Sequence, residues 1–285
     1  MEANSATKIY GVLGYPVKHS FSPAMHNAAF ESLGINAEYR LFEIEPGKLG
    51  SFLKSLKDNC ICGLNVTVPY KEKVLTYLQR QSSEVRFTGA ANTLIVKDNN
   101  YLEGWNTDGI GFHRHLTDDL KFIILGAKVF ILGAGGAAKA VVDQLVRHGA
   151  NNIYIYDIYK DKSRKLADKT NAEFPKSKSL SVETISSFDF RDINLLINAT
   201  PIGMKEGDPL LICADTFHPG LLVYDLIYNP AETKLLRMAK EKGCEVSNGL
   251  GMLLYQGARS FKLWTGQDAP LEVMRQALNQ AVKKC

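Results

Sequence analysis

The sequence predicts an α/β protein of two domains, and three observations indicate this fold class. The chain has 285 residues, of which 45% are hydrophobic, and this length is about twice the commonest domain size of roughly 100–150 residues. Short apolar runs alternate with longer amphipathic runs almost from end to end, which is typical of βαβ units around a mostly parallel sheet. A buried run that leads into a glycine-rich segment starts a second such series near the middle of the chain.

The first domain is predicted to cover residues 1–107. Its β-branched or alternating apolar runs are bounded by Gly, Pro or Asn and predict strands at residues 8–13, 39–43, 63–68 and 93–96. Amphipathic runs between them predict helices at residues 23–33, 49–56 and 71–78. Because ligands of such folds bind at the carboxyl ends of the strands, we expect a site where the polar residues of this domain gather.

The second domain is predicted to cover residues 108–248. A short helix to about residue 116 leads to a buried strand at 128–132, an apolar helix that ends near residue 148, and a strand at 152–157. Apolar runs at 194–198 and 221–225 continue the series, and residues 249–285 predict helices that pack back on the first domain. No long linker separates the domains, so we expect the active site in the cleft between them.

Charge and cysteine content restrict the class of function. The 34 Lys and Arg residues outnumber the 30 Asp and Glu residues without forming a basic run, so neither nucleic acid nor a membrane surface is indicated as a partner. The five cysteines form no CxxC pair and the first residues are polar, which predicts a reduced, cytoplasmic protein. The six histidines do not have the spacing of metal ligands, so no metal is expected.

A glycine-rich segment follows the strand predicted at residues 128–132. Gly133, Gly135 and Ala138 fit the pattern G-x-G-x-x-[G/A], in which the first glycine makes a tight turn and the second lets the backbone approach a pyrophosphate. A glycine-rich turn without a ligand is the alternative. The strand before it and the helix after it favour a Rossmann-type dinucleotide-binding domain, whose loop would consist of Gly133, Ala134, Gly135, Gly136 and Ala137.

Asp157 ends the next predicted strand, about 20 residues further on, and bears on the choice of dinucleotide. A carboxylate there can accept hydrogen bonds from the ribose hydroxyls of NAD and would repel the 2′-phosphate of NADP. The cations Lys160, Lys162 and Arg164 follow closely and could offset that repulsion. The sequence therefore favours NAD and leaves NADP open.

Hydroxyl groups precede the first predicted helix. Pro23 suits the first helical position and Ser22 suits the N-cap, so Ser22 is either a simple cap or part of a binding site. In the second case Ser20 and Ser22 would hold a substrate carboxylate at the helix N-terminus.

Polar residues also line a predicted strand and the helix that follows it. The period of two places Asn65 and Thr67 on one face of the strand at residues 63–68. Lys71 is predicted to open the next helix, where the helix dipole disfavours a cation. Lys71 is therefore either a solvated surface residue or part of a binding site.

Amides and a carboxylate stand at the ends of later elements. Asn92, Asn106 and Asp108 could each be a cap or a turn former, but together they are suited to a polyhydroxylated ligand. Gln256 lies in an apolar predicted helix, where a buried amide needs a partner.

These residues resemble the shikimate dehydrogenase family, and the resemblance covers nearly the whole chain. Several independent motifs occur in the order of the family: GYPVKHSFSPAMHN at residues 14–27, GLNVTVPYK at 63–71, ANT at 91–93, NTDG at 106–109, GAGGA at 133–137, NATPIGM at 198–204, and GLGM at 249–252 with Gln256.

The resemblance implies hydride transfer between C3 of shikimate and a nicotinamide, which produces or consumes 3-dehydroshikimate in the shikimate pathway of aromatic amino acid biosynthesis. It implies that Ser20 and Ser22 hold the carboxylate, while the ring hydroxyls are held by Asn65, Thr67, Asn92, Asp108 and Gln256. Lys71 and Asp108 would be the catalytic pair. The Lys71 ammonium can donate a proton to the reacting oxygen, and Asp108 stabilises that charge and fixes its direction.

By the same resemblance, the nicotinamide end of the cofactor would lie along residues 198–204. The residues implied there are Thr200, Met204, Ile227 and Gly249, and Tyr228 would border the substrate. The second domain would close on the first by a hinge and exclude water from the cleft.

One departure from the family pattern concerns the cofactor. Many biosynthetic members carry Asn-Arg-Thr after the second strand of the nucleotide domain and use the arginine for NADP, whereas this chain has Asp157-Ile-Tyr159. This resembles the NAD-using branch that also oxidises quinate for catabolism, although Ser20 and Ser22 are similar to the shikimate-type pocket. Three hypotheses follow: an NAD-preferring enzyme, an NADP enzyme of biosynthesis, and a non-catalytic binding relative. The protein is expected to be a monomer or homodimer.

Overall fold

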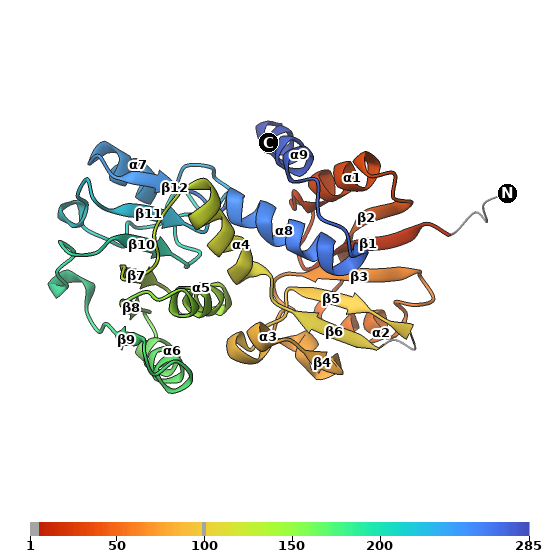
Figure 1. Cartoon of the computed structure of the whole chain (residues 1–285), viewed down its shortest axis with the longest axis horizontal. Coiled ribbons are helices and arrows are strands. Elements are labelled where there is room, and N and C mark those ends of the chain that lie inside the picture. Colours follow the sequence, from red (N-terminus) through yellow and green to blue (C-terminus); the bar gives the residue numbers. More distant parts are fainter. Residues whose placement is uncertain (1–5, 99–100, 285) are drawn as a thin grey trace. The chain divides into compact units, whose positions relative to one another are not determined.

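The computed structural model describes residues 6–98 and 101–284, which form two compact units (Figure 1). Unit 1 consists of the chain up to Gly111 together with the chain from Leu254 onward, and unit 2 consists of Phe112–Leu253. The chain passes from one unit to the other inside helix α4 (Asp108–Arg114) and again inside helix α8 (Leu250–Thr265). The boundaries therefore lie within helices and not in loops.

Unit 1 contains a six-stranded mixed sheet in the order β2-β1-β3-β5-β6-β4. Strands β1, β2 and β3 pair in parallel, as do β4 and β6, whereas β5 pairs antiparallel with β3 and with β6. The strands are β1 (Lys8–Gly14), β2 (Ala37–Glu43), β3 (Ile61–Val66), β4 (Arg80–Gln81), β5 (Thr93–Val96) and β6 (Leu102–Trp105).

Helices cover both faces of this sheet because its strands alternate between two apolar layers. On one face Ile9 belongs to a buried cluster with Leu49 and Leu53 of α2 (Leu49–Lys54). On the other face Tyr10 stacks on Phe30 of α1 (Ser22–Ser32) and on Trp264 of α8. Helix α9 (Leu271–Lys283) packs beside α1, as Figure 1 shows. The C-terminal helix is thus part of the layer that covers unit 1.

The segment predicted as a helix at residues 71–78 is different in the structure. Only a short 3₁₀ helix forms there, η2 (Lys73–Tyr77), and Lys71 lies in the turn before it. The Lys71 carbonyl accepts a hydrogen bond from Ala91 N at 2.8 Å, so it is used by a neighbouring segment and not by a helix. The prediction that Lys71 opens a helix was wrong. The sequence interpretation also missed β4, β6 and α3 (Ser83–Thr88).

Unit 2 contains a six-stranded parallel sheet in the order β12-β11-β10-β7-β8-β9. Renumbered along the unit, this is the order 3-2-1-4-5-6 of a doubly wound dinucleotide-binding fold. The strands are β7 (Lys128–Leu132), β8 (Asn152–Tyr156), β9 (Lys178–Ser181), β10 (Leu195–Asn198), β11 (Leu222–Asp225) and β12 (Glu245–Ser247). The predicted Rossmann-type fold is confirmed.

The helices of unit 2 differ between the two faces of its sheet. Helices α5 (Gly136–Arg147) and α6 (Lys160–Glu173) pack next to each other in Figure 1. Phe130 and Leu132 of β7 instead join a buried cluster with α7 (Lys234–Glu241). Three short helical turns complete the unit: η4 (His115–Asp119), η5 (Ile185–Ser187) and η6 (Ala214–Thr216). Across the described residues, no helix combines the length and apolar character needed to span a membrane.

Candidate active site

A lysine and a carboxylate form the centre of a polar site in unit 1. Lys71 Nζ lies 2.6 Å from Asp108 Oδ2. Lys71 reaches this position from the turn after β3, and Asp108 is the first residue of α4. The Asp108 side chain is 10% exposed and that of Lys71 is 29% exposed. The carboxylate is therefore fixed in the protein, while the ammonium can still reach a ligand.

Asn92 orients the other oxygen of the Asp108 carboxylate. Asn92 Nδ2 donates to Asp108 Oδ1 at 2.7 Å, and Asn92 Oδ1 accepts a hydrogen bond from Thr107 N at 2.7 Å. Gln256 Oε1 lies 3.3 Å from Asn92 Nδ2, which supplies the partner expected for a buried amide in α8. Asn92, Thr107, Asp108 and Gln256 are all buried. The pair of Lys71 and Asp108 is thus held by a connected side-chain network.

Asn65 extends this network toward β2 and α8. Its Nδ2 donates to Thr93 Oγ1 at 3.1 Å and to Ser260 Oγ at 3.0 Å, and its Oδ1 accepts from the Tyr39 hydroxyl at 2.8 Å. The sequence interpretation missed Tyr39, Thr93 and Ser260. Residues Asn65 and Ser260 are 195 positions apart in the sequence, so no local pattern could have found their contact.

Ser20 and Ser22, at the start of α1, are placed differently from the predicted cap. The N-cap position of α1 is Phe21, whose side chain makes no capping hydrogen bond, and Ser22 is already helical. The prediction of Ser22 as N-cap was wrong because the buried Ser22 hydroxyl bonds to the Tyr39 side chain instead. Burial raises the pKa of Tyr39 above its usual range, and the bond from Ser22 opposes that shift. Ser22 is thereby joined to Asn65 through Tyr39, and Ser20 Oγ accepts from Ser22 N at 3.3 Å.

Two further predicted residues of unit 1, Thr67 and Asn106, lie beside this network. Thr67 follows β3 and donates its backbone N–H to Leu13 O at 2.9 Å. Asn106 forms the turn before α4, since its Oδ1 accepts from Asp108 N at 3.1 Å and its Nδ2 donates to Ala90 O at 2.9 Å. Asn106 is therefore explained as a turn former that sets the direction of Asp108.

The glycine loop of unit 2 has the geometry expected of its motif. Gly133 has φ +100°, and a Cβ there would lie 3.0 Å from Ala199 O. Gly135 is the N-cap of α5, and a Cβ on Gly135 or Gly136 would meet no atom within 4 Å. Ala138, the third small residue of the motif, is fully buried. The loop leaves open space at the N-terminus of α5, which fits a pyrophosphate bound by backbone N–H groups.

Asp157 follows β8 and is fixed by two backbone donors. Its Oδ2 accepts from Ala134 N at 2.8 Å, and its Oδ1 accepts from Tyr159 N at 2.9 Å. Ala134 itself is buried, whereas Ala137 is half-buried. The carboxylate thus links the glycine loop to the end of β8, where the motif expects an acidic residue.

A second polar cluster connects the ends of β10 and β11 in unit 2. Asn198 Nδ2 donates to Asp225 Oδ1 at 3.0 Å, and Thr200 Oγ1 donates to Asn198 Oδ1 at 2.7 Å. Asp225 Oδ1 also accepts from Ile227 N at 3.0 Å, and Asp225 Oδ2 accepts from Thr233 Oγ1 at 2.7 Å. Burial raises the pKa of Asp225 to about 6, against the effect of these hydrogen bonds. Asp225 was not identified from the sequence, although it ends an apolar strand.

The remaining predicted residues of unit 2 border this second cluster. Gly249 N donates to Ile227 O at 3.1 Å, and a Cβ on Gly249 would lie 2.1 Å from Leu226 O, so this close approach requires glycine. Met204 is 56% exposed, and Tyr228 is half-buried. Within the described residues, no group of three or more His, Cys, Asp or Glu side chains could hold a metal ion.

Unit 2 has a parallel doubly wound sheet with a glycine loop, and unit 1 has a lysine–carboxylate pair in a polar network. This combination is found in dinucleotide-dependent oxidoreductases. The comparison with known proteins gives the family. Residues 12–94 match the family model described as shikimate dehydrogenase substrate binding domain, and residues 249–278 match that of the shikimate 5′-dehydrogenase C-terminal domain. The shikimate dehydrogenase (NADP(+)) of Methanopyrus kandleri is 42% identical over 98% of this chain and 97% of its own length. The chain belongs to the shikimate dehydrogenase family.

Solved structures agree in fold over nearly the full length. A shikimate dehydrogenase in complex with NADP+ has a TM-score of 0.90 and 37% identity, covering 98% of this chain and 97% of its own. The Listeria monocytogenes shikimate 5-dehydrogenase in complex with shikimate and NAD has a TM-score of 0.88 and 34% identity, covering 98% of both chains. The Corynebacterium glutamicum quinate dehydrogenase in complex with NAD has a TM-score of 0.88 and 28% identity, covering 96% of this chain and 99% of its own.

Proposed function

We propose that this protein interconverts shikimate and 3-dehydroshikimate, with unit 1 (residues 1–111 and 254–285) binding the substrate and unit 2 (residues 112–253) binding a nicotinamide dinucleotide. The observation that carries this proposal is the contact of 2.6 Å between Lys71 Nζ and Asp108 Oδ2 within a network of buried amides. Family membership and the glycine loop of unit 2 support the same reaction.

The proposed roles of the substrate-binding residues come from the family resemblance and are supported by the chemistry of their side chains. Asn65, Asn92 and Gln256 present amide groups that suit ring hydroxyls, because an amide both donates and accepts hydrogen bonds. Ser20 and Ser22 lie at the start of α1, where hydroxyl and backbone N–H groups suit the substrate carboxylate. By the same resemblance, Thr67 of unit 1 and Tyr228 of unit 2 would also contact the substrate.

Lys71 would transfer the proton at the reacting oxygen. In the direction of reduction, the ammonium donates a proton to the carbonyl oxygen at C3 as the hydride arrives at the carbon, and the resulting amine is reprotonated from solvent. Asp108 stabilises the ammonium and fixes its direction, since one carboxylate oxygen contacts Lys71 and the other accepts from Asn92. In the direction of oxidation, the neutral amine accepts the same proton.

A bound nicotinamide dinucleotide would supply or accept the hydride, and the residues of unit 2 fit it. Gly135 and Gly136 leave open space at the N-terminus of α5 for the pyrophosphate. Thr200, Met204, Ile227 and Gly249 would surround the nicotinamide end, and Asp157 would accept from the ribose of the adenosine end.

For the cofactor, we propose a preference for NAD over NADP. Asp157 supports it, because a carboxylate at the end of β8 suits two free ribose hydroxyls and repels a 2′-phosphate. The curated relative from Methanopyrus kandleri is named for NADP(+), and the Listeria enzyme was solved with NAD. The preference would set this chain apart from relatives that are about 40% identical to it.

The test is a set of four initial-rate assays, with shikimate or quinate as substrate and NAD or NADP as cofactor. We expect the largest kcat/KM with shikimate and NAD. Equal or better rates with NADP would contradict the cofactor preference, and the absence of turnover in all four assays would contradict the reaction.

Quinate is a second candidate substrate. The sequence Asp157-Ile-Tyr159 resembles the NAD-using quinate/shikimate branch, and the Corynebacterium quinate dehydrogenase shares the fold. The paired Ser20 and Ser22 favour shikimate. The intact Lys71–Asp108 pair argues against a non-catalytic binding protein, because such a protein has no need of a proton donor.

A further inference from the structure

Three cations gather at the N-terminus of α6 in unit 2, where the helix dipole disfavours positive charge. Lys160 is the first residue of α6, and Lys162 and Arg164 follow within its first turns. This helix begins three residues after Asp157, the residue expected to contact the adenosine ribose. The cations therefore lie where an enzyme that uses NADP would need them for the 2′-phosphate.

Glu183 lies at the same end of the sheet as Asp157. Strand β8 pairs in parallel with β9, with Ile155 opposite Ser181, and Val182 N donates to Ile155 O at 2.8 Å. Continuing this register by two residues brings Glu183 level with Asp157. Ser163 Oγ lies 2.7 Å from Ser181 Oγ, which ties the first turn of α6 to the end of β9.

Glu183 binds two of the three cations. Lys160 Nζ lies 3.2 Å from Glu183 Oε2, and Arg164 Nη2 donates to Glu183 Oε1. Lys160 and Arg164 are four residues apart, so they lie on one face of α6 and a single carboxylate can reach both. The hydrogen bond from Arg164, followed by that from Lys160, lowers the pKa of Glu183. Arg164 also lies 4.0 Å from Asp161.

The third cation is engaged by an aromatic ring. Lys162 Nζ lies 4.6 Å from the centroid of the Tyr159 ring, a distance at which a cation is attracted to the ring face. Tyr159 is 65% exposed. All three cations near Asp157 thus have partners supplied by this unit.

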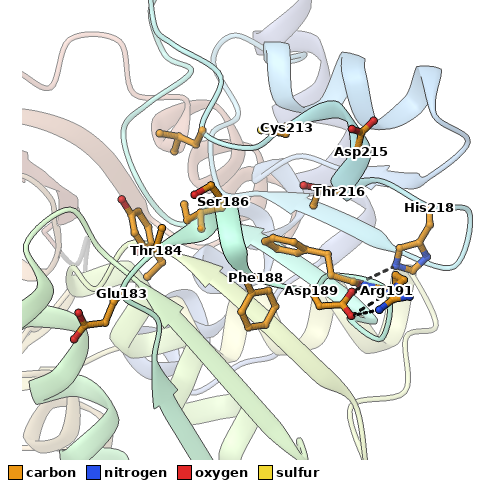
Figure 2. A pocket seen from close by; sticks show the side chains of 14 residues that line it. Glu183, Thr184, Ser186, Phe188, Asp189, Arg191, Cys213, Asp215, Thr216 and His218 are labelled. Atoms are coloured by element: carbon orange, nitrogen blue, oxygen red, sulfur yellow. Dashed lines mark hydrogen bonds and ion pairs between the residues drawn. The ribbon is translucent and has the colours of Figure 1, made fainter.

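Glu183 also stands at the edge of a cavity of about 690 Å³. Figure 2 shows Glu183 at the opposite end of this cavity from His218 and away from the pair of Asp189 and Arg191. The Glu183 carboxylate is bonded to Lys160 of α6. Its charge therefore acts on the N-terminal end of α6 and not on the polar groups at the other end of the cavity.

We propose that Glu183 is a determinant of cofactor specificity: by binding Lys160 and Arg164 it withholds both cations from a 2′-phosphate and adds a second negative charge beside Asp157. The inference rests on the proposed function, since it assumes that the adenosine end of a dinucleotide binds at the end of β8. It predicts that removal of the Glu183 charge alone makes unit 2 more tolerant of a 2′-phosphate, although Asp157 is unchanged.

The test measures binding by isothermal titration calorimetry with the full chain and with two probes that lack nicotinamide. Adenosine 2′,5′-bisphosphate carries the 2′-phosphate, and adenosine 5′-monophosphate does not. The variants are Glu183→Gln, the double variant Glu183→Gln with Arg164→Gln, and Glu241→Gln as a matched control at an exposed position of α7. Glu183 is half exposed, so its replacement should leave folding intact.

We expect Glu183→Gln to bind the bisphosphate about 3- to 5-fold more tightly than the native chain. Binding of the monophosphate should stay the same, and the double variant should lose the gain. The ratio of kcat/KM for NADP to that for NAD should rise in parallel. An unchanged bisphosphate affinity, or an equal gain for both probes, would overturn the proposal. Because the calorimetry requires neither shikimate nor turnover, its outcome is separate from that of the four assays that test the reaction.

Discussion

The two units prepare their sites by different physical means. In unit 1 the candidate site is a network of side chains, in which Asn92 joins Asp108, Thr107 and Gln256 and in which Tyr39 and Ser260 bind Asn65. In unit 2 the glycine loop depends on the backbone: Gly133 has φ +100°, and a Cβ on Gly135 would meet no atom within 4 Å. A side-chain network fixes the direction of each group, whereas a backbone loop provides space and N–H donors.

Because of this difference, the two sites should respond differently to mutation. A change of one atom in the network should alter the groups bonded to it, because buried polar groups that lose a partner remain desolvated. A change in the loop should act through added volume or backbone strain. Variants in the two units can therefore distinguish loss of a hydrogen-bond partner from loss of space.

Replacement of Asp108 by Asn should have a large effect on turnover. It keeps the shape of the side chain but removes the charge that contacts Lys71 at 2.6 Å. We expect kcat for shikimate oxidation to fall about 10²- to 10³-fold, because proton transfer would lose its positioned, charged partner. Asp58→Asn, at an exposed position of unit 1, is the control and should keep native kcat. A loss of less than threefold in the Asp108 variant would show that the network is not part of the chemistry.

The pH dependence of stability should differ between the units, first through Asp225 of unit 2. Its pKa is raised to about 6 by burial, so the folded state holds the proton more tightly than the unfolded state. This contribution to stability is present below about pH 4 and is lost as the pH rises through about 6. Asp225→Asn should reduce this loss by about 2 kcal/mol, as measured by denaturant unfolding at about pH 4 and about pH 8. If the unfolding free energy of the variant depended on pH as that of the native chain does, the Asp225 carboxyl would not have a raised pKa in the folded protein.

His26 of unit 1 should act in the opposite direction. It is fully buried, stacks on Tyr39 with centroids 4.4 Å apart, and has no hydrogen-bond partner for either ring nitrogen among the described residues. Burial lowers its pKa to about 3, so the unfolded state binds a proton first as the pH falls below about 6.5.

Replacement of His26 by Phe should retain the stack and remove this effect. The decrease in unfolding free energy between about pH 8 and about pH 5 should become smaller by about 2 kcal/mol. The measurement is denaturant unfolding of both proteins at the two pH values. If the variant shows the same decrease as the native chain, His26 is not buried in its neutral form.

Two glycine variants should separate strain from space in the loop of unit 2. Gly133→Ala requires φ +100° and places a Cβ 3.0 Å from Ala199 O, so we expect a loss of about 1–2 kcal/mol of stability. Gly135→Ala adds a Cβ to open space, so stability should stay the same while dinucleotide affinity falls on the order of tenfold. Thermal unfolding and NAD titration check both. Equal loss of stability in the two variants would contradict the assigned roles.

The sequence predicted most of this architecture because its signals are local. The glycine pattern, the alternating strands and the positions of Asn92, Asp108 and Gln256 are visible in short windows, and the structure contains the corresponding elements. What failed depends on contacts between distant segments. Lys71 was expected to open a helix, but its carbonyl bonds to Ala91 N, and Tyr39 and Ser260 come to Asn65 from segments remote in the sequence.

Lys71→Ala is the sharpest test of the proposal that Lys71 transfers the proton in hydride exchange with shikimate. Steady-state kinetics with NAD should show kcat lower by about 10²- to 10⁴-fold, with KM for shikimate within about threefold of the native value. Lys73→Ala, which removes a neighbouring lysine outside the network, should keep native kcat. A Lys71→Ala enzyme with near-native kcat would contradict the account.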